Sequence, residues 1–69
     1  MKYYSYAEPT ENDGVAIFTM REDAILEDYW PYWQMKMLTL YPPGHSLITK
    51  ENCLEDWVAV NWAWEETIN

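Results

Sequence analysis

The sequence predicts a single α+β domain over residues 1–69, in which one main helix packs on one face of a three-stranded antiparallel sheet. Three observations predict it. Two early segments rich in β-branched and aromatic residues flank an Asp-Gly turn, a middle segment has apolar residues at helical spacing, and a late segment is again β-branched and aromatic. A chain this short buries only about 60% of its unfolded surface, so it has room for one core. The expected order of elements is ββα(α)β.

The first two segments predict an antiparallel hairpin. Residues 2–8 read KYYSYAE and residues 15–20 read VAIFTM, and both compositions are typical of strands. Between them, residues 9–14 read PTENDG, whose Asp-Gly end tolerates the positive φ that hairpin loops require. We therefore expect the chain to turn back on itself at residues 9–14.

The main helix is expected to begin at Thr19, because Thr19 and Glu22 have the spacing of a capping box. Its apolar residues recur at spacings of three and four and form one stripe, which consists of Ile25, Leu26, Tyr29, Trp30, Trp33 and Met37. Pro31 removes one backbone hydrogen bond inside this helix, so we expect a kink there. The segment YPPGH at residues 41–45 ends the helix, because a proline disfavours helical geometry in the residue before it.

The last third of the chain permits two readings. Thr49 can cap a short helical turn that continues to Asp56. Residues 57–64 then read WVAVNWAW, and their β-branched and aromatic content favours a strand over a helix. The strand reading places Val58, Val60, Trp62 and Trp64 on one face, and the helical reading continues Leu54, Trp57, Val58 and Asn61 along one side.

Charge restricts the classes of partner. Twelve Asp and Glu against four Lys and Arg give a formal net charge of −8. Such a chain is repelled by nucleic acid and by anionic membranes, so we expect no direct binding to either, and we expect a protein partner with a basic surface. The acids can mimic nucleic acid and attract the basic groove of a nucleic-acid-binding enzyme, or they can be ordinary solvated charges.

The compartment follows from the cysteine content and from the absence of long apolar runs. Cys53 is the single cysteine, so it has no partner for an internal disulfide, which fits a reducing environment. The first residues have no apolar stretch of signal-peptide length, and no segment approaches the ~20 apolar residues of a membrane helix. We therefore expect a cytoplasmic protein.

The residues with catalytic or ligand chemistry do not form a recognisable site. His45 and Cys53 are eight positions apart and form a possible catalytic pair, but a small thiol beside Leu54 is more often buried and inert. The paired carboxylates lack the enclosed cleft that glycoside hydrolysis needs, and no spacing of Cys, His or acids matches a zinc or calcium site. We expect no catalytic residues, no metal and no cofactor, and hence a protein that is not an enzyme.

The chain has more aromatic side chains than one helix can cover on one face of the sheet. Interfaces are enriched in Tyr and Trp, so rings on the uncovered face are candidates for contact with a partner. Together with the helix acids they make the predicted partner-binding set: Tyr4, Tyr6, Glu22, Asp23, Glu27, Asp28, Trp57, Trp62 and Trp64. The alternative is a structural module in which an exposed aromatic sheet face pairs with a second copy as a homodimer.

Three stretches of the chain also resemble a known group. The opening MKYYSYAEP, the segment DYWPYW at residues 28–33 and the segment ENCLEDWVAVNWA at residues 51–63 are similar to short acidic proteins of unassigned function from phages and phage-derived regions of bacterial genomes. The resemblance implies a small accessory protein in the host cytoplasm, and phage proteins of this size often bind and inhibit host proteins. It assigns no functional residues.

Overall fold

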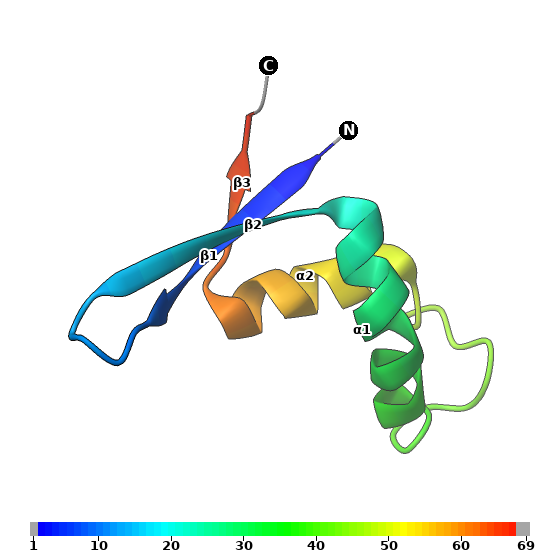
Figure 1. Cartoon of the computed structure of the whole chain (residues 1–69). Coiled ribbons are helices and arrows are strands. Elements are labelled where there is room, and N and C mark those ends of the chain that lie inside the picture. The colour runs from blue at the N-terminus through cyan, green and yellow to red at the C-terminus, as the bar shows by residue number, and fades with distance from the viewer. Residues whose placement is uncertain (1, 68–69) are drawn as a thin grey trace.

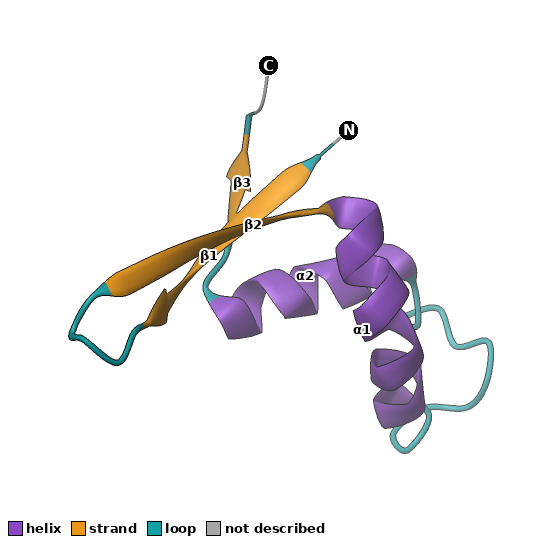
Figure 2. Cartoon of the chain, viewed as in Figure 1, coloured by secondary structure: helices purple, strands orange, loops and turns teal. Residues whose placement is uncertain are grey.

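The computed structural model describes residues 2–67 and confirms the α+β class and the ββα(α)β order. Figure 1 shows the sheet crossing the molecule, with the two helices below it. The elements are β1 (Tyr3–Pro9), β2 (Val15–Arg21), α1 (Glu22–Met37), α2 (Lys50–Asn61) and β3 (Trp64–Glu66). A long loop over residues 38–49 joins the two helices on the side away from the sheet (Figure 2).

Strands β1 and β2 form the predicted hairpin. Their antiparallel register pairs Tyr3 with Arg21 and Tyr6 with Phe18. The turn is closed by the Thr10 backbone N–H, which donates to the Gly14 carbonyl at 3.0 Å. Asp13 takes the positive φ, at 59°. Asp tolerates the left-handed region better than most residues because its short polar side chain can bond locally, so the Asp-Gly signal identified this turn correctly.

The sheet order is β2-β1-β3, which makes β1 the central strand. Strand β3 runs antiparallel to β1 and pairs Tyr3 with Glu66 and Ser5 with Trp64. Because side chains alternate along a strand, the sheet has two faces of different composition. The inner face, toward the helices, carries Tyr4, Tyr6, Phe18 and Met20, and the outer face carries Ser5, Val15, Ile17, Thr19 and Trp64.

The predicted capping box at Thr19 is wrong. Strand β2 continues to Arg21, and the Thr19 hydroxyl is hydrogen-bonded to the Ser5 hydroxyl across the sheet at 2.7 Å. Helix α1 begins at Glu22, whose backbone N–H donates to the Lys2 carbonyl at 2.9 Å. The sheet therefore supplies partners for both groups, and these long-range bonds displace the local cap that the sequence spacing suggested.

Helix α1 continues through Pro31 as one element of 16 residues. Pro31 and Glu27 are both exposed, so water can bond the Glu27 carbonyl that lacks its helical donor. The predicted apolar stripe is confirmed, with Ile25 and Trp33 buried and the other four residues half-buried. The proline therefore neither ends nor restarts the helix, because its ring lies on the solvent side.

The strand predicted for residues 57–64 is wrong, and the helical alternative is correct for most of it. The Thr49 hydroxyl caps α2, as predicted, by accepting from the Asn52 backbone N–H at 3.1 Å. The helix then runs to Asn61, and β3 begins only at Trp64. The helix places Cys53 and Trp57 one turn apart, and both are buried. Burial of this pair outweighs the β-propensity of the segment.

The core lies between the inner sheet face and the two helices. Tyr4, Ile25 and Trp57 form its centre, each from a different element. The residues packed around them are Tyr6, Met20, Tyr29, Leu54, Val58 and Ala63. Neither helix in residues 2–67 has the length and apolar character needed to cross a lipid bilayer.

Candidate protein-binding surface

Three of the predicted partner-binding residues, Tyr4, Tyr6 and Trp57, lie mostly inside the protein. Tyr4 is 8% exposed and Trp57 is 9% exposed. Tyr6 is half-buried, with its ring stacked on Phe18 at 5.5 Å and edge-on to Trp57 at 5.7 Å between ring centroids. Tyr4 and Tyr6 share one face of β1, and the helices cover that face. Tyr4 is therefore a core residue and not a surface residue.

Trp62 and Trp64 are on the surface, at separate places. Trp62 ends α2 in the left-handed region, with φ of 54°, and is 88% exposed. Trp64 lies on the outer sheet face opposite Ser5, and its indole N–H donates to the Glu66 carboxylate. The two rings belong to different backbone conformations, so they do not form the single strand face expected for residues 57–64.

The four predicted acids of α1 have different environments. Asp23 forms a two-pronged ion pair with Arg21, with nitrogen to oxygen distances of 2.6 and 3.0 Å, and the hydrogen bond from Arg21 lowers the pKa of Asp23. Glu22 is half-buried, whereas Glu27 and Asp28 are exposed. Arg21 with Asp23 is the single ion pair within residues 2–67, so most acids of the described chain have no direct counterion.

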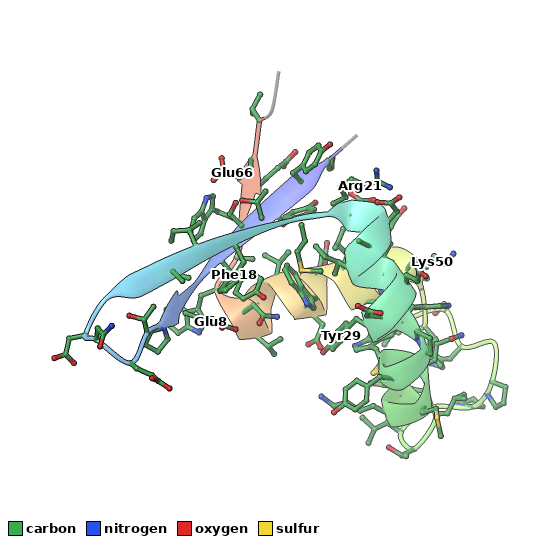
Figure 3. The ribbon with its side chains drawn as sticks, in the orientation of Figure 1. Glu8, Phe18, Arg21, Tyr29, Lys50 and Glu66 are labelled. Carbon is green, nitrogen blue, oxygen red and sulfur yellow. The ribbon has the colours of Figure 1, made fainter. Side chains whose placement is uncertain are left out.

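Asp28 borders a hollow of about 310 Å³ between β2, α1 and α2, which we call the trough. Figure 3 shows Phe18 and Tyr29 in the angle that these three elements enclose. The trough is lined by Met20, Ile25, Asp28, Tyr29, Tyr32 and Trp57. Its lining therefore combines three aromatic rings with one carboxylate and contains no Lys or Arg.

The aromatic rings of the trough are held in different ways. The Tyr29 hydroxyl donates to the Asp56 carboxylate at 2.8 Å, which ties α1 to α2. Burial raises the pKa of Tyr29, and this hydrogen bond raises it further, so the side chain stays neutral. The Tyr32 ring lies 5.8 Å from the Tyr29 ring between centroids and is 62% exposed. The trough thus has a fixed inner ring and an open outer ring.

A second hollow of about 330 Å³ lies on the opposite side of α1. It is lined by Asp23, Leu26, Glu27, Trp30, Pro31 and Lys50. Of its two carboxylates, that of Asp23 is paired with Arg21, and the lining also includes the basic side chain of Lys50. The lining of the trough therefore has an acid and no base, whereas the lining of the second hollow includes a base.

Sequence reasoning missed Tyr29, Tyr32 and Met20 as site residues. Tyr29 was assigned to the apolar stripe, and the structure shows that it serves both the core and the trough. One signal was available: Asp28 and Tyr32 are four residues apart, which puts a carboxylate and a ring on one face of a helix. The contribution of Trp57 from α2 depends on the fold and has no such signal.

The other chemically reactive groups, Cys53 and His45, are not among the residues that line the trough. Cys53 is a buried free thiol, and burial raises its pKa to about 11. The His45 ring lies 4.5 Å from the Tyr41 ring, and its Nδ1 accepts from the Leu47 backbone N–H at 3.1 Å. A protonated, buried thiol is a poor nucleophile. No group of three or more His, Cys, Asp and Glu in the described part of the chain is placed to hold a metal ion.

Comparison with known proteins does not add to this description. No protein-family model, no curated protein and no solved structure matches the chain.

Proposed function

We propose that this protein is a non-catalytic binding protein for a protein with a basic surface, and that the trough and the adjoining acids of α1 make the contact. The observation that carries the proposal is the composition of the trough, in which three aromatic rings and one carboxylate meet without a basic side chain. Rings of this kind supply most of the binding energy of protein interfaces, because they combine large apolar area with little loss of conformational freedom.

The net charge of −8 supports the same partner class. A strongly acidic protein attracts basic surfaces at long range, which raises the rate of encounter and makes binding sensitive to salt. Glu27 and Asp28 are neighbours on α1, both are exposed, and neither belongs to the ion pair of Arg21 with Asp23, so this helix presents a ridge of negative charge. Bound over the basic groove of a nucleic-acid-binding enzyme, the ridge takes the place of the nucleic acid and inhibits the enzyme.

This role fits a small accessory protein of phage type that acts on a host protein in the cytoplasm. The free thiol of Cys53 agrees with a reducing compartment. The protein then needs no catalytic centre of its own, because it acts by occupying the surface of its target.

The proposal is tested by capture followed by titration. The tagged protein is used as bait in a lysate of the cells that naturally contain it, bound proteins are identified by mass, and the strongest binder is purified. We expect a basic protein whose affinity falls as salt rises, because the encounter is electrostatic. The double variant E27Q/D28N should weaken binding about tenfold, whereas E11Q/D13N, which changes the net charge equally in the exposed hairpin loop, should weaken it less than threefold.

Two results would overturn the proposal. One is a binder with an acidic surface and an affinity that does not depend on salt. The other is an equal loss of affinity in the two double variants, because the contact would then depend on the total charge and not on the acids of α1.

A second candidate function is self-association through the outer sheet face. Val15 is 67% exposed and Ile17 is 55% exposed on this face, and β2 is an edge strand of seven residues. Exposed apolar edge strands can pair with another chain. Light scattering distinguishes this candidate: a persistent dimer that dissociates in the variant Ile17→Lys would support it, and a monomer at all concentrations would remove it.

A further inference from the structure

We propose that the trough receives the side chain of an arginine from the partner protein. The inference rests on the proposed function and names the group that the site recognises. The trough holds about 310 Å³, which is at the lower end of the ~300–1,000 Å³ range of small-molecule sites. Its size suits one long side chain and excludes a larger folded element.

The rings of the trough suit a flat cation. Tyr29 and Tyr32 approach from α1 and Trp57 from α2, so aromatic groups border the space from two helices. The Tyr29 ring is fixed by its hydrogen bond to Asp56, and Trp57 is fixed by its edge-on contact with Tyr6. A cation over such ring faces is stabilised by the negative charge of the π systems, and a guanidinium stacks on them more often than an ammonium does.

Asp28 completes the recognition of a cation. Its carboxylate is exposed at the rim, one helical turn before Tyr32. Asp56 adds a second negative charge behind Tyr29, where it accepts the tyrosine hydrogen bond. In Figure 3, Arg21 lies at the start of α1 and Lys50 lies on the far side of α1 from Tyr29. The carboxylate of Asp28 therefore has no neighbouring base in the lining to neutralise it.

Arginine fits this combination better than other side chains. Its planar guanidinium can stack on a ring and at the same time donate two parallel hydrogen bonds to a carboxylate. An apolar side chain would cover the Asp28 carboxylate without giving it a partner, and an acidic one would be repelled. A lysine ammonium is a strongly hydrated point charge and gains less from the rings.

The test uses the whole chain and capped peptides of the sequence Ser-Gly-Arg-Gly-Ser, together with counterparts that carry lysine or the neutral isostere citrulline in place of arginine. Binding is followed by nuclear magnetic resonance at millimolar peptide concentration. We expect the arginine peptide to shift the signals of Tyr29, Tyr32 and the Trp57 indole. The citrulline peptide should bind about tenfold more weakly, because it lacks the charge for both the rings and Asp28.

Two variants and a matched control locate the contact. Asp28→Asn should weaken the arginine peptide about fivefold through the lost ion pair, and Tyr32→Leu about threefold through the lost ring. Glu55→Gln changes the net charge as Asp28→Asn does, at an exposed residue of α2 outside the lining, and should change binding less than twofold. Asp28 and Tyr32 are exposed, so these variants should fold, and unchanged amide spectra confirm it.

The outcomes separate this inference from the proposed function. Equal binding of the arginine and citrulline peptides, equal binding of the lysine peptide, or equal effects of Asp28→Asn and Glu55→Gln would each overturn the arginine inference. If those results appear while the captured basic protein still binds E27Q/D28N more weakly than the wild type, the proposed function is supported and the arginine site is wrong. If the arginine peptide binds in the trough but no basic protein is captured, the arginine site is supported and the proposed function is wrong.

Discussion

The two faces of the sheet differ in how far the helices cover them. On the inner face, Tyr4 and Tyr6 pack against the helices, and Tyr4 belongs to the core. On the outer face, Val15 and Ile17 are exposed, and no helix in the described chain covers them. The comparison shows that some of the aromatic and apolar side chains stabilise the fold, whereas others are exposed and available for contact with a partner. The trough lies where the covered face opens to solvent.

The largest effect should come from contrasting two tryptophans. Trp57→Ala should lower the free energy of unfolding by about 3–5 kcal/mol, because the ring is buried against Tyr4 and Ile25. Trp62→Ala should change it by less than about 0.5 kcal/mol, because that ring is exposed. Urea denaturation measures both values. Similar losses of unfolding free energy in the two variants would contradict the assignment of Trp57 to the core and Trp62 to the surface.

The second largest effect should come from high pH, which should lower the free energy of unfolding. The pKa of Cys53 in the folded protein is about 11, against 9.0 for an ordinary thiol. A raised pKa means that the folded state holds the proton more tightly, so this stability is complete below pH 9 and is lost as the pH rises toward 11. The loss attributable to Cys53 should be about 2 kcal/mol. The raised pKa of Tyr29 acts in the same direction.

The contribution of Cys53 is isolated by comparing how steeply the free energy of unfolding falls with pH in two proteins. Urea denaturation of the wild type and of Cys53→Ala between pH 8.5 and 11 should show a shallower fall of this free energy for the variant, whatever its stability at neutral pH. Parallel curves for the two proteins would contradict the assignment of this pH dependence to the buried thiol.

A smaller effect should separate the two tyrosines of the trough. Tyr29→Phe removes the hydrogen bond to Asp56 and leaves that half-buried carboxylate without its partner, which should cost about 1–2 kcal/mol. Tyr32→Phe is the matched control, because its ring is exposed, and it should cost less than about 0.5 kcal/mol. Thermal unfolding followed by circular dichroism measures both. A loss in Tyr32→Phe as large as that in Tyr29→Phe would show that the Asp56 bond is not what ties the helices together.

The smallest effect is expected on the outer face. Ile17→Thr keeps a β-branched side chain at an exposed strand position, so the free energy of unfolding should change by less than about 0.5 kcal/mol. Met20→Thr, on the inner face of the same strand, should cost more, because Met20 packs against the core. The reverse order in urea denaturation would mean that the two faces have been assigned the wrong way round.

Local signals predicted much of this fold. The Asp13 turn, the apolar stripe around Trp33 and the Thr49 cap all depend on neighbouring residues, and each is confirmed. The prediction of a cap at Thr19 was wrong because the Thr19 hydroxyl is hydrogen-bonded to the hydroxyl of Ser5, on the neighbouring strand. Residues 57–61 became helical because Trp57 reaches the core only from a helix that also buries Cys53.

The candidate site was predicted less well than the fold, for a related reason. Asp28 was identified from its charge, but the rings beside it come from two helices, and no pattern in the sequence shows that Trp57 and Tyr32 meet. Alternation along a strand indicates that Tyr4 and Tyr6 share a face, but it does not indicate which face the helices cover. Both questions depend on packing between distant segments.

The most direct test of the trough as the binding surface is a residue-by-residue map of an arginine peptide on the protein. Nuclear magnetic resonance of the Trp indoles, Tyr rings and Ile methyl groups reports the trough and the outer face in one titration. We predict that Trp57, Tyr32 and Ile25 shift together and saturate, while Ile17 and Trp64 do not move. Shifts confined to Ile17 and Trp64 would place the contact on the outer sheet face and contradict the account.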